Sequence, residues 1–104
     1  MSDVLNLASL VEYQAGSVVS RTLIKKQAGT VTLFAFAEGE GLSEHTAPYD
    51  ALVHILEGEA EVTLAGDVHR LGAGAAILMP AGVPHALQAN QRFKMLLTMV
   101  KSSD

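Results

Sequence analysis

Short runs of apolar and polar residues, each closed by glycine or proline, cover most of this chain. The runs lie at 17–26, 30–38, 50–58, 59–66, 68–74, 75–80, 81–90 and 92–100. Runs in which apolar and polar residues alternate, bounded by turn residues, are typical of strands. About eight or nine such strands, with no segment of helical period, predict an all-β sandwich or barrel. The N-terminal stretch before Gly16 has room for about one helical turn.

Two of these runs show which side chains should face inward. At 59–64 the apolar residues Ala60, Val62 and Leu64 share one face and polar residues share the other, and residues 65–67 are expected to form a tight hairpin turn. On the last run, the parity expected to face the interior is that of Phe93, Met95, Leu97 and Met99.

The run at 50–58 is apolar on both of its faces. Ala51, Val53 and Ile55 share one face of the expected strand, and Leu52, His54 and Leu56 share the other. A strand with one solvated face would place polar residues at every second position. We therefore expect one face to line the barrel interior and the other to be covered by a second sheet, the N-terminal segment or another subunit.

Length and composition predict a single small domain that associates with a copy of itself. The chain has 104 residues, of which 49% are hydrophobic and 17% are charged. Roughly 25% charged residues is typical of soluble domains, and a small domain needs a polar surface. We therefore expect some apolar surface to be buried in a homodimer.

Charge and residue content exclude several classes of function. The net charge is −4, and the only basic cluster is the pair Lys25 and Lys26, so we expect no nucleic-acid partner. The absence of cysteine excludes thiol catalysis, disulfides and thiolate metal sites. No apolar run reaches the ~18 residues of a membrane helix, and no basic leader precedes an apolar segment. We expect a cytoplasmic protein with no membrane partner.

The spacing of several glycines, prolines and histidines resembles the two signatures of the cupin superfamily. Gly74, Pro80, Gly82 and His85 match the second signature, whose closing asparagine is displaced by one position to Asn90. Three residues match the first signature, namely Gly39, His45 and Gly58.

The resemblance implies an RmlC-like jelly roll, also called a double-stranded β-helix or cupin barrel. It assigns residues 1–104 to one domain, with the barrel at about 30–100. Residues 1–29 would form an N-terminal strand or arm that packs on the barrel or on a partner subunit.

The resemblance also implies a metal centre, but this chain has only part of it. Metal-binding cupins hold a divalent ion such as Fe, Mn, Ni, Cu or Zn with three histidines and one glutamate. His45 and His85 match two of these histidines, whereas Ala47 and Ala51 replace the third histidine and the glutamate. A two-histidine, one-carboxylate site would need one more ligand, for which the sequence offers Asp50, Glu44 and Glu40.

Strand parity separates the remaining candidates. His54 has the opposite parity to Ala51, so we expect it to face away from the pocket in a packing or interface role. We expect His69 to be exposed or near a strand edge. Pro80, Gly82 and Pro84 should turn the chain so that His85 begins an inward-facing strand. Small and apolar residues then line the expected ligand pocket: Ala47, Ala51, Met79, Leu87 and Met95.

Three hypotheses of function follow from these residues. The first is a cupin barrel that binds a small molecule at His45 and His85, with a weakly held divalent metal or none. The second is a metal-dependent oxygenase or isomerase in which the metal polarises a substrate oxygen. The third is a metal-free, sugar-modifying enzyme with a histidine as general base. No catalytic residue is assigned, and the sequence leaves open whether the protein is an enzyme.

Overall fold

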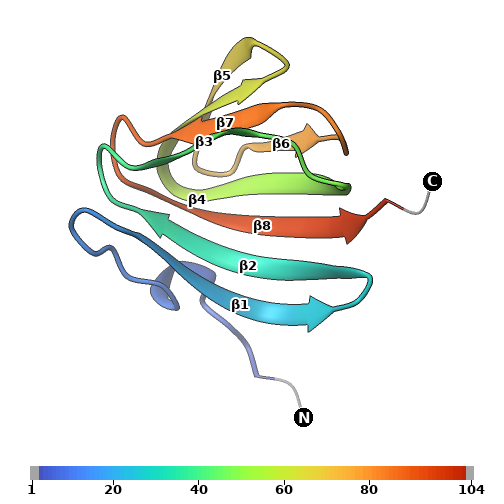
Figure 1. The fold of residues 1–104 in the computed structure, drawn as a ribbon. Coiled ribbons are helices and arrows are strands. Elements are labelled where there is room, and N and C mark those ends of the chain that lie inside the picture. Colours follow the sequence, from blue (N-terminus) through green and yellow to red (C-terminus); the bar gives the residue numbers. More distant parts are fainter. Residues whose placement is uncertain (1–2, 103–104) are drawn as a thin grey trace.

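The computed structural model describes residues 3–102, in which eight strands form one curled antiparallel sheet (Figure 1). The elements are η1 (Leu7–Ser9), β1 (Val18–Lys26), β2 (Gly29–Phe36), β3 (Gly41–His45), β4 (Tyr49–Leu64), β5 (Asp67–Gly72), β6 (Ala76–Met79), β7 (His85–Gln88) and β8 (Phe93–Lys101). The order β1-β2-β8-β4-β7-β3, with β5 and β6 also paired to β4, is consistent with a jelly-roll barrel. This confirms the predicted all-β class. No helix within residues 3–102 is long and apolar enough to cross a membrane.

Strand β4 is continuous where the sequence predicted two strands. Residues 50–58 and 59–66 were expected to be separated by a turn at Gly58, but one strand runs from Tyr49 to Leu64. Its first part pairs with β6 and β8, and its second part pairs with β5 and β7. Gly58 has a φ of +79°, so it bends the strand and does not end it. The bend directs one strand into both halves of the curled sheet.

The tight hairpin turn expected at residues 65–67 is present between β4 and β5. Leu64 pairs with Asp67, which leaves two residues in the loop. Ala65 and Gly66 have φ values of +51° and +86°. Positive φ at both central positions is the geometry of the turns that match the twist of paired strands.

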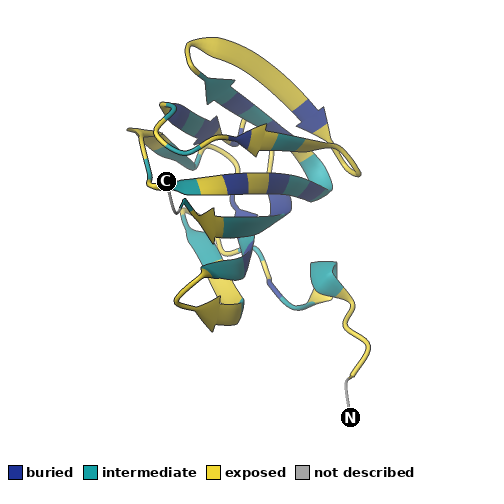
Figure 2. Cartoon of the chain, turned by 90° about the vertical axis from the view of Figure 1, so that its right-hand side faces the viewer, coloured by how far each residue is buried: buried dark blue, intermediate teal, exposed yellow. Residues whose placement is uncertain are grey.

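The core lies inside the curl and draws on both halves of the sheet. Phe36 and Phe93 stack with their ring centroids 4.5 Å apart, and Met95 is buried beside them in the same cluster. Figure 2 shows buried and exposed residues alternating along the strands. On β8, Leu97 and Met99 pack against this cluster, so the predicted inward parity of the last strand is confirmed.

An N-terminal arm, defined here as residues 7–15, covers part of the outer side of the sheet. Val11 is buried in a second apolar cluster with Leu33 and Ala35. The Tyr13 hydroxyl donates a hydrogen bond to Glu57 Oε2 at 2.6 Å, and Lys94 Nζ donates one to the Ala8 carbonyl oxygen at 2.6 Å. The arm therefore covers one face of β2 and β8.

The hydrogen bond of Tyr13 makes the attachment of the arm sensitive to alkaline pH. Burial, the bond to Glu57 and the charge of that carboxylate raise the pKa of Tyr13 well above its usual value of 10.0, and the nearby Arg92 opposes this shift. A raised pKa in the folded state gives stability that is complete below pH 10 and falls as the pH rises through the folded value. We therefore expect the free energy of unfolding to decrease above pH 10.

Urea unfolding at pH 9 and pH 11 measures this dependence, with Tyr13→Phe as the comparison. The variant loses one hydrogen bond, worth about 1 kcal/mol at pH 9, and loses less stability than the wild type between the two pH values. Equal losses in the two proteins would show that the Tyr13 hydroxyl does not control the alkaline response.

Candidate functional site

A tight turn before β7 sets the position of His85. The Val83 amide donates a hydrogen bond to the Pro80 carbonyl oxygen at 3.3 Å, and Gly82 between them has a φ of +78°. A β-turn whose third residue has a positive φ favours glycine at that position, because glycine adopts a positive φ without a steric penalty. His85 is then the first residue of β7, and it is only 7% exposed. The structure thus gives Pro80 and Gly82 the turning role that the sequence predicted.

The chain segment with the alanine replacements holds this turn in place. The Gly82 amide donates a hydrogen bond to the Ala47 carbonyl oxygen at 2.9 Å, and the Ala81 amide donates one to Asp50 Oδ1 at 2.9 Å. Asp50 is paired with Val100 on the outer side of β4, next to the inward-facing Ala51. Its carboxylate therefore fastens the turn and does not take the place of the missing glutamate.

The structure brings the imidazole rings of His45 and His85 together. His45 ends β3 and pairs directly with His85. The two Nε2 atoms are 3.1 Å apart, and the rings meet edge-on at 66° with centroids 4.3 Å apart. His85 is buried and His45 is exposed, so the pair connects the barrel interior with solvent.

Backbone carbonyl groups orient both rings in the same way. His45 Nδ1 lies 2.8 Å from the Ser43 carbonyl oxygen, and His85 Nδ1 lies 3.0 Å from that of Val83. A carbonyl oxygen can only accept a hydrogen bond, so each Nδ1 carries the hydrogen. In a neutral ring the Nε2 atom then has a free lone pair, and two such lone pairs face each other at 3.1 Å. The pair is therefore suited to a cation between its rings, either a shared proton or a metal ion.

The two histidines could supply only part of the coordination sphere of a metal ion. The 3.1 Å between the Nε2 atoms is less than two Zn–N bonds of about 2.0–2.1 Å placed end to end, so one ion can contact both. Within residues 3–102, no group of three or more His, Cys, Asp or Glu side chains is arranged to hold a metal. Asp50, Glu44 and Glu40 therefore do not add a third ligand to the two histidines, and an ion held there would take its other ligands from water or a bound molecule.

Four of the five residues expected to line a ligand pocket lie together in the barrel core. Ala51, Met79, Leu87 and Met95 are each at most 5% exposed and belong to the cluster around Phe93. Ala47 is half-buried beside the turn and contributes its carbonyl group to Gly82.

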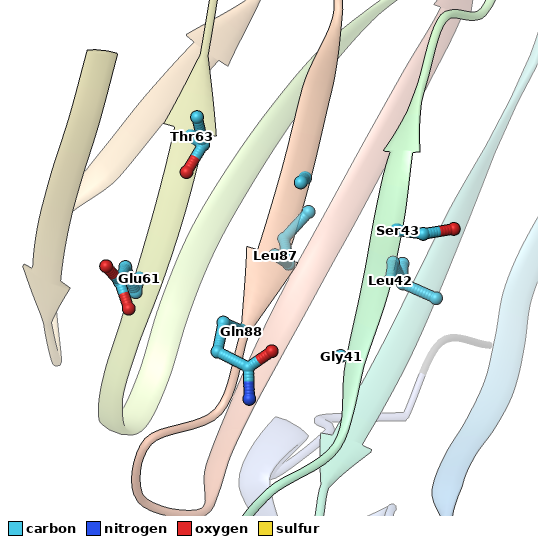
Figure 3. A pocket seen from close by; sticks show the side chains of 8 residues that line it. Gly41, Leu42, Ser43, Glu61, Thr63, Leu87 and Gln88 are labelled. Atoms are coloured by element: carbon cyan, nitrogen blue, oxygen red, sulfur yellow. The ribbon is translucent and has the colours of Figure 1, made fainter. Parts of the chain in front are cut away.

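A hollow that the sequence did not indicate lies on β3, β7 and the second part of β4 (Figure 3). Its volume is about 360 Å³, and it is lined by Gly41, Leu42, Ser43, Glu61, Thr63, Ala86, Leu87 and Gln88. Asn90 Nδ2 donates a hydrogen bond to Glu61 Oε2 at 2.6 Å. The alternation at 59–64 predicted polar side chains facing away from the core, but only strand pairing shows that three strands form one hollow.

The two remaining histidines lie outside the His45–His85 pair. His54 is half-buried and is paired with Leu96 and Ala76 on the outer side of the sheet. His69 is exposed on β5. Both positions agree with the predictions from strand parity.

The topology, with two histidines meeting on neighbouring strands, places the protein among double-stranded β-helix proteins. A family model described as "Cupin domain" matches residues 32–100. The chain therefore belongs to the cupin superfamily.

Solved structures of bacterial cupins and related proteins are similar to this chain. A conserved protein of unknown function from Streptococcus pyogenes is 39% identical, with a TM-score of 0.93 over 100% of this chain and 91% of that chain. A cupin superfamily protein from Desulfitobacterium hafniense is 34% identical, with a TM-score of 0.92 over 98% of this chain and 94% of its own. A Leptotrichia buccalis cupin 2 conserved barrel domain protein is 43% identical, with a TM-score of 0.90, and the match covers 93% of this chain but only 47% of that protein. A search of curated proteins finds no match.

Proposed function

We propose that this protein is a small-molecule-binding cupin whose site is centred on His45 and His85 and includes a weakly held divalent metal ion. The observation that carries the proposal is the 3.1 Å approach of the two Nε2 atoms, with both Nδ1 atoms turned to backbone carbonyls. Imidazole nitrogen suits late first-row metals such as Ni²⁺, Cu²⁺ and Zn²⁺. With only two protein ligands, most of the coordination sphere stays open to the oxygens of a ligand.

The residues around the pair would give the site its rigidity. The Pro80–Val83 turn is tied to Ala47 and Asp50, so the starting point of β7 is fixed relative to the end of β3. The carbonyl groups of Ser43 and Val83 hold the two rings with Nε2 directed at the same point. When bound, a metal would act as a Lewis acid toward a ligand oxygen.

Titration of the metal-free protein with Zn²⁺ or Ni²⁺ in a calorimeter tests the proposal. We expect one metal ion per chain and an affinity that falls at least about 100-fold in His85→Ala and in His45→Ala, because each removes one of two nitrogen ligands. His69→Ala is the matched control, since it removes an exposed histidine outside the pair. Equal affinity in the wild type and His85→Ala would contradict the metal centre.

The same geometry also suits a metal-free histidine pair. A distance of 3.1 Å is within the range of a hydrogen bond in which one Nε2 is protonated and donates to the other. Such a pair has the acid and base forms that proton transfer requires. If no metal binds to the wild type, the remaining candidate is a metal-free, sugar-modifying enzyme with a histidine as general base. Conversion of a sugar substrate by the wild type that is lost in His85→Ala would support it.

A further inference from the structure

A separate hollow, here called the end hollow, lies at the end of the barrel opposite the His45–His85 pair. His45 is the last residue of β3 and His85 is the first residue of β7. The end hollow lies at the other ends of these two strands, where residues 37–40 lead into β3 and residues 89–92 follow β7. The N-terminal arm passes the same place, and the three segments lie together at the left of the molecule in Figure 1.

Backbone hydrogen bonds tie these segments to one another. The Gly39 amide donates a hydrogen bond to the Ala89 carbonyl oxygen at 2.7 Å, and the Ala89 amide donates one to the Glu40 carbonyl oxygen at 2.8 Å. The Ala37 amide donates one to the carbonyl oxygen of Ser17, shortly after the arm, at 3.1 Å. The end hollow is therefore a preformed feature of the fold, and its walls come from distant parts of the chain.

The lining of the end hollow combines an apolar wall with two opposite charges. Its volume is about 510 Å³, within the range of about 300–1,000 Å³ that is usual for small-molecule sites. The residues that line it are Tyr13, Ala15, Ala37, Glu38, Gln91 and Arg92. The tyrosine ring and the two alanine methyl groups supply the apolar wall, and the carboxamide supplies both a donor and an acceptor.

The two charged side chains of this lining are not paired with each other. Among residues 3–102 the only ion pair joins Lys94 and Glu57, so the charges of Arg92 and Glu38 stand apart in the same hollow. The Arg92 guanidinium lies over the Tyr13 ring, with Cζ 4.6 Å from the ring centroid. This contact holds the guanidinium at the wall of the hollow, and its fork can still donate two parallel hydrogen bonds to a carboxylate.

Separate opposite charges in one hollow favour a ligand that carries both charges. A carboxylate of the ligand would accept hydrogen bonds from Arg92, and an ammonium group would donate to the Glu38 carboxylate. An anion without an ammonium group would be repelled by Glu38, and a cation without a carboxylate would be repelled by Arg92. The apolar wall favours a ligand whose remaining part is apolar.

We propose that the end hollow binds a zwitterionic small molecule of the α-amino-acid class. Its carboxylate would lie on Arg92, its ammonium group on Glu38 and its side chain against Tyr13. Such a ligand would bridge the arm and the barrel, because Tyr13 belongs to the arm whereas Arg92 directly precedes β8. Neither histidine of the His45–His85 pair lines the end hollow, so the proposal stands apart from the metal centre.

Titration of the isotope-labelled protein with L-phenylalanine, followed by NMR, tests the proposal. We expect saturable shifts of the amide signals of Ala15, Ala37 and Gln91, and smaller changes at His45 and His85. N-acetyl-L-phenylalanine lacks the ammonium charge and L-phenylalanine amide lacks the carboxylate, so each should bind at least about tenfold more weakly. The absence of saturable shifts up to about 20 mM L-phenylalanine, or equal binding of either analogue, would overturn the proposal.

Two variants that each remove one charge test the roles of the side chains. Arg92→Gln and Glu38→Gln should each raise the dissociation constant of L-phenylalanine at least about tenfold, because each removes a hydrogen bond between charged groups. Arg70→Gln and Glu59→Gln are the matched controls, since both side chains are exposed and lie outside the end hollow. The amide spectrum shows whether each variant is folded, and the exposed Glu38 keeps the test available if Arg92→Gln does not fold. Unchanged binding in either folded variant, or an equal loss in its control, would show that the ligand does not use these two charges and that the proposal is wrong.

Discussion

Gly58→Ala is expected to cost about 2–5 kcal/mol in the free energy of unfolding, from two separate penalties. The φ of Gly58 is +79°, and an L-residue in the left-handed region loses about 1–2 kcal/mol. A Cβ there would also clash with the Arg92 carbonyl oxygen and lie 2.9 Å from Phe93 Cα. These backbone atoms belong to Phe93, the first residue of β8, and to Arg92 just before it, and overpacking of this kind adds about 1–3 kcal/mol.

Gly66→Ala is the matched control for this substitution. Gly66 has a similar φ of +86°, but a Cβ there would meet no atom within 4 Å. Urea unfolding of both variants at one protein concentration gives their free energies of unfolding. The difference between the two losses is the free-energy cost of the clash, because both variants carry the cost of an alanine at positive φ. We expect Gly66→Ala to lose only the conformational part, and equal losses would show that the close approach to Arg92 and Phe93 does not matter. A loss of about 3 kcal/mol is a large part of the 5–15 kcal/mol by which domains are stable.

Lys94→Ala is expected to destabilise the protein by about 2–3 kcal/mol and to release the N-terminal arm. Lys94 is 7% exposed, and its Nζ bonds to the Ala8 carbonyl oxygen at 2.6 Å and lies 5.0 Å from the centroid of the Tyr13 ring. Truncation removes this charged hydrogen bond and the packing of the aliphatic stem. The ion pair with Glu57 is 3.8 Å long, and the Glu57 side chain is 43% exposed, so it contributes little.

Hydrogen exchange of the arm and urea unfolding together measure the effect. Lys94→Met keeps most of the packing, so it should lose less stability than Lys94→Ala while still exposing the arm to exchange. Lys25→Ala is the control, because Lys25 is exposed on β1 and should change stability by less than about 0.5 kcal/mol. Unchanged exchange in both Lys94 variants would mean that the apolar cluster around Val11 holds the arm without the lysine.

Local sequence patterns predicted most of the strands and the turns between them. The prediction of a strand at 59–64 depended only on alternating burial, and that of a turn at 65–67 only on local turn residues. Both the strand and the turn are present. Gly58 was misjudged, because a glycine with positive φ serves equally in a turn and in a strand bend. Only the pairing of β4 with four neighbours distinguishes the two.

The candidate site was only partly predictable for the same reason. The spacing around Pro80 and Gly82 indicated where His85 would start a strand, and strand parity directed His54 away from the interior. Lys94 has the parity of an outward-facing residue, yet it is buried. Its burial depends on the arm, which returns across the sheet from a distant part of the chain, and no local pattern records that contact.

The sequence by itself determined the all-β class, the inward and outward faces of its strands, and the two histidines that match the cupin signatures. These features depend on side-chain period and on turn residues, which act over a few positions. Only the tertiary structure decided that the histidine Nε2 atoms meet at 3.1 Å and that Asp50 fastens a turn. Each depends on the register between strands far apart in the chain, which is set when the sheet closes around its core.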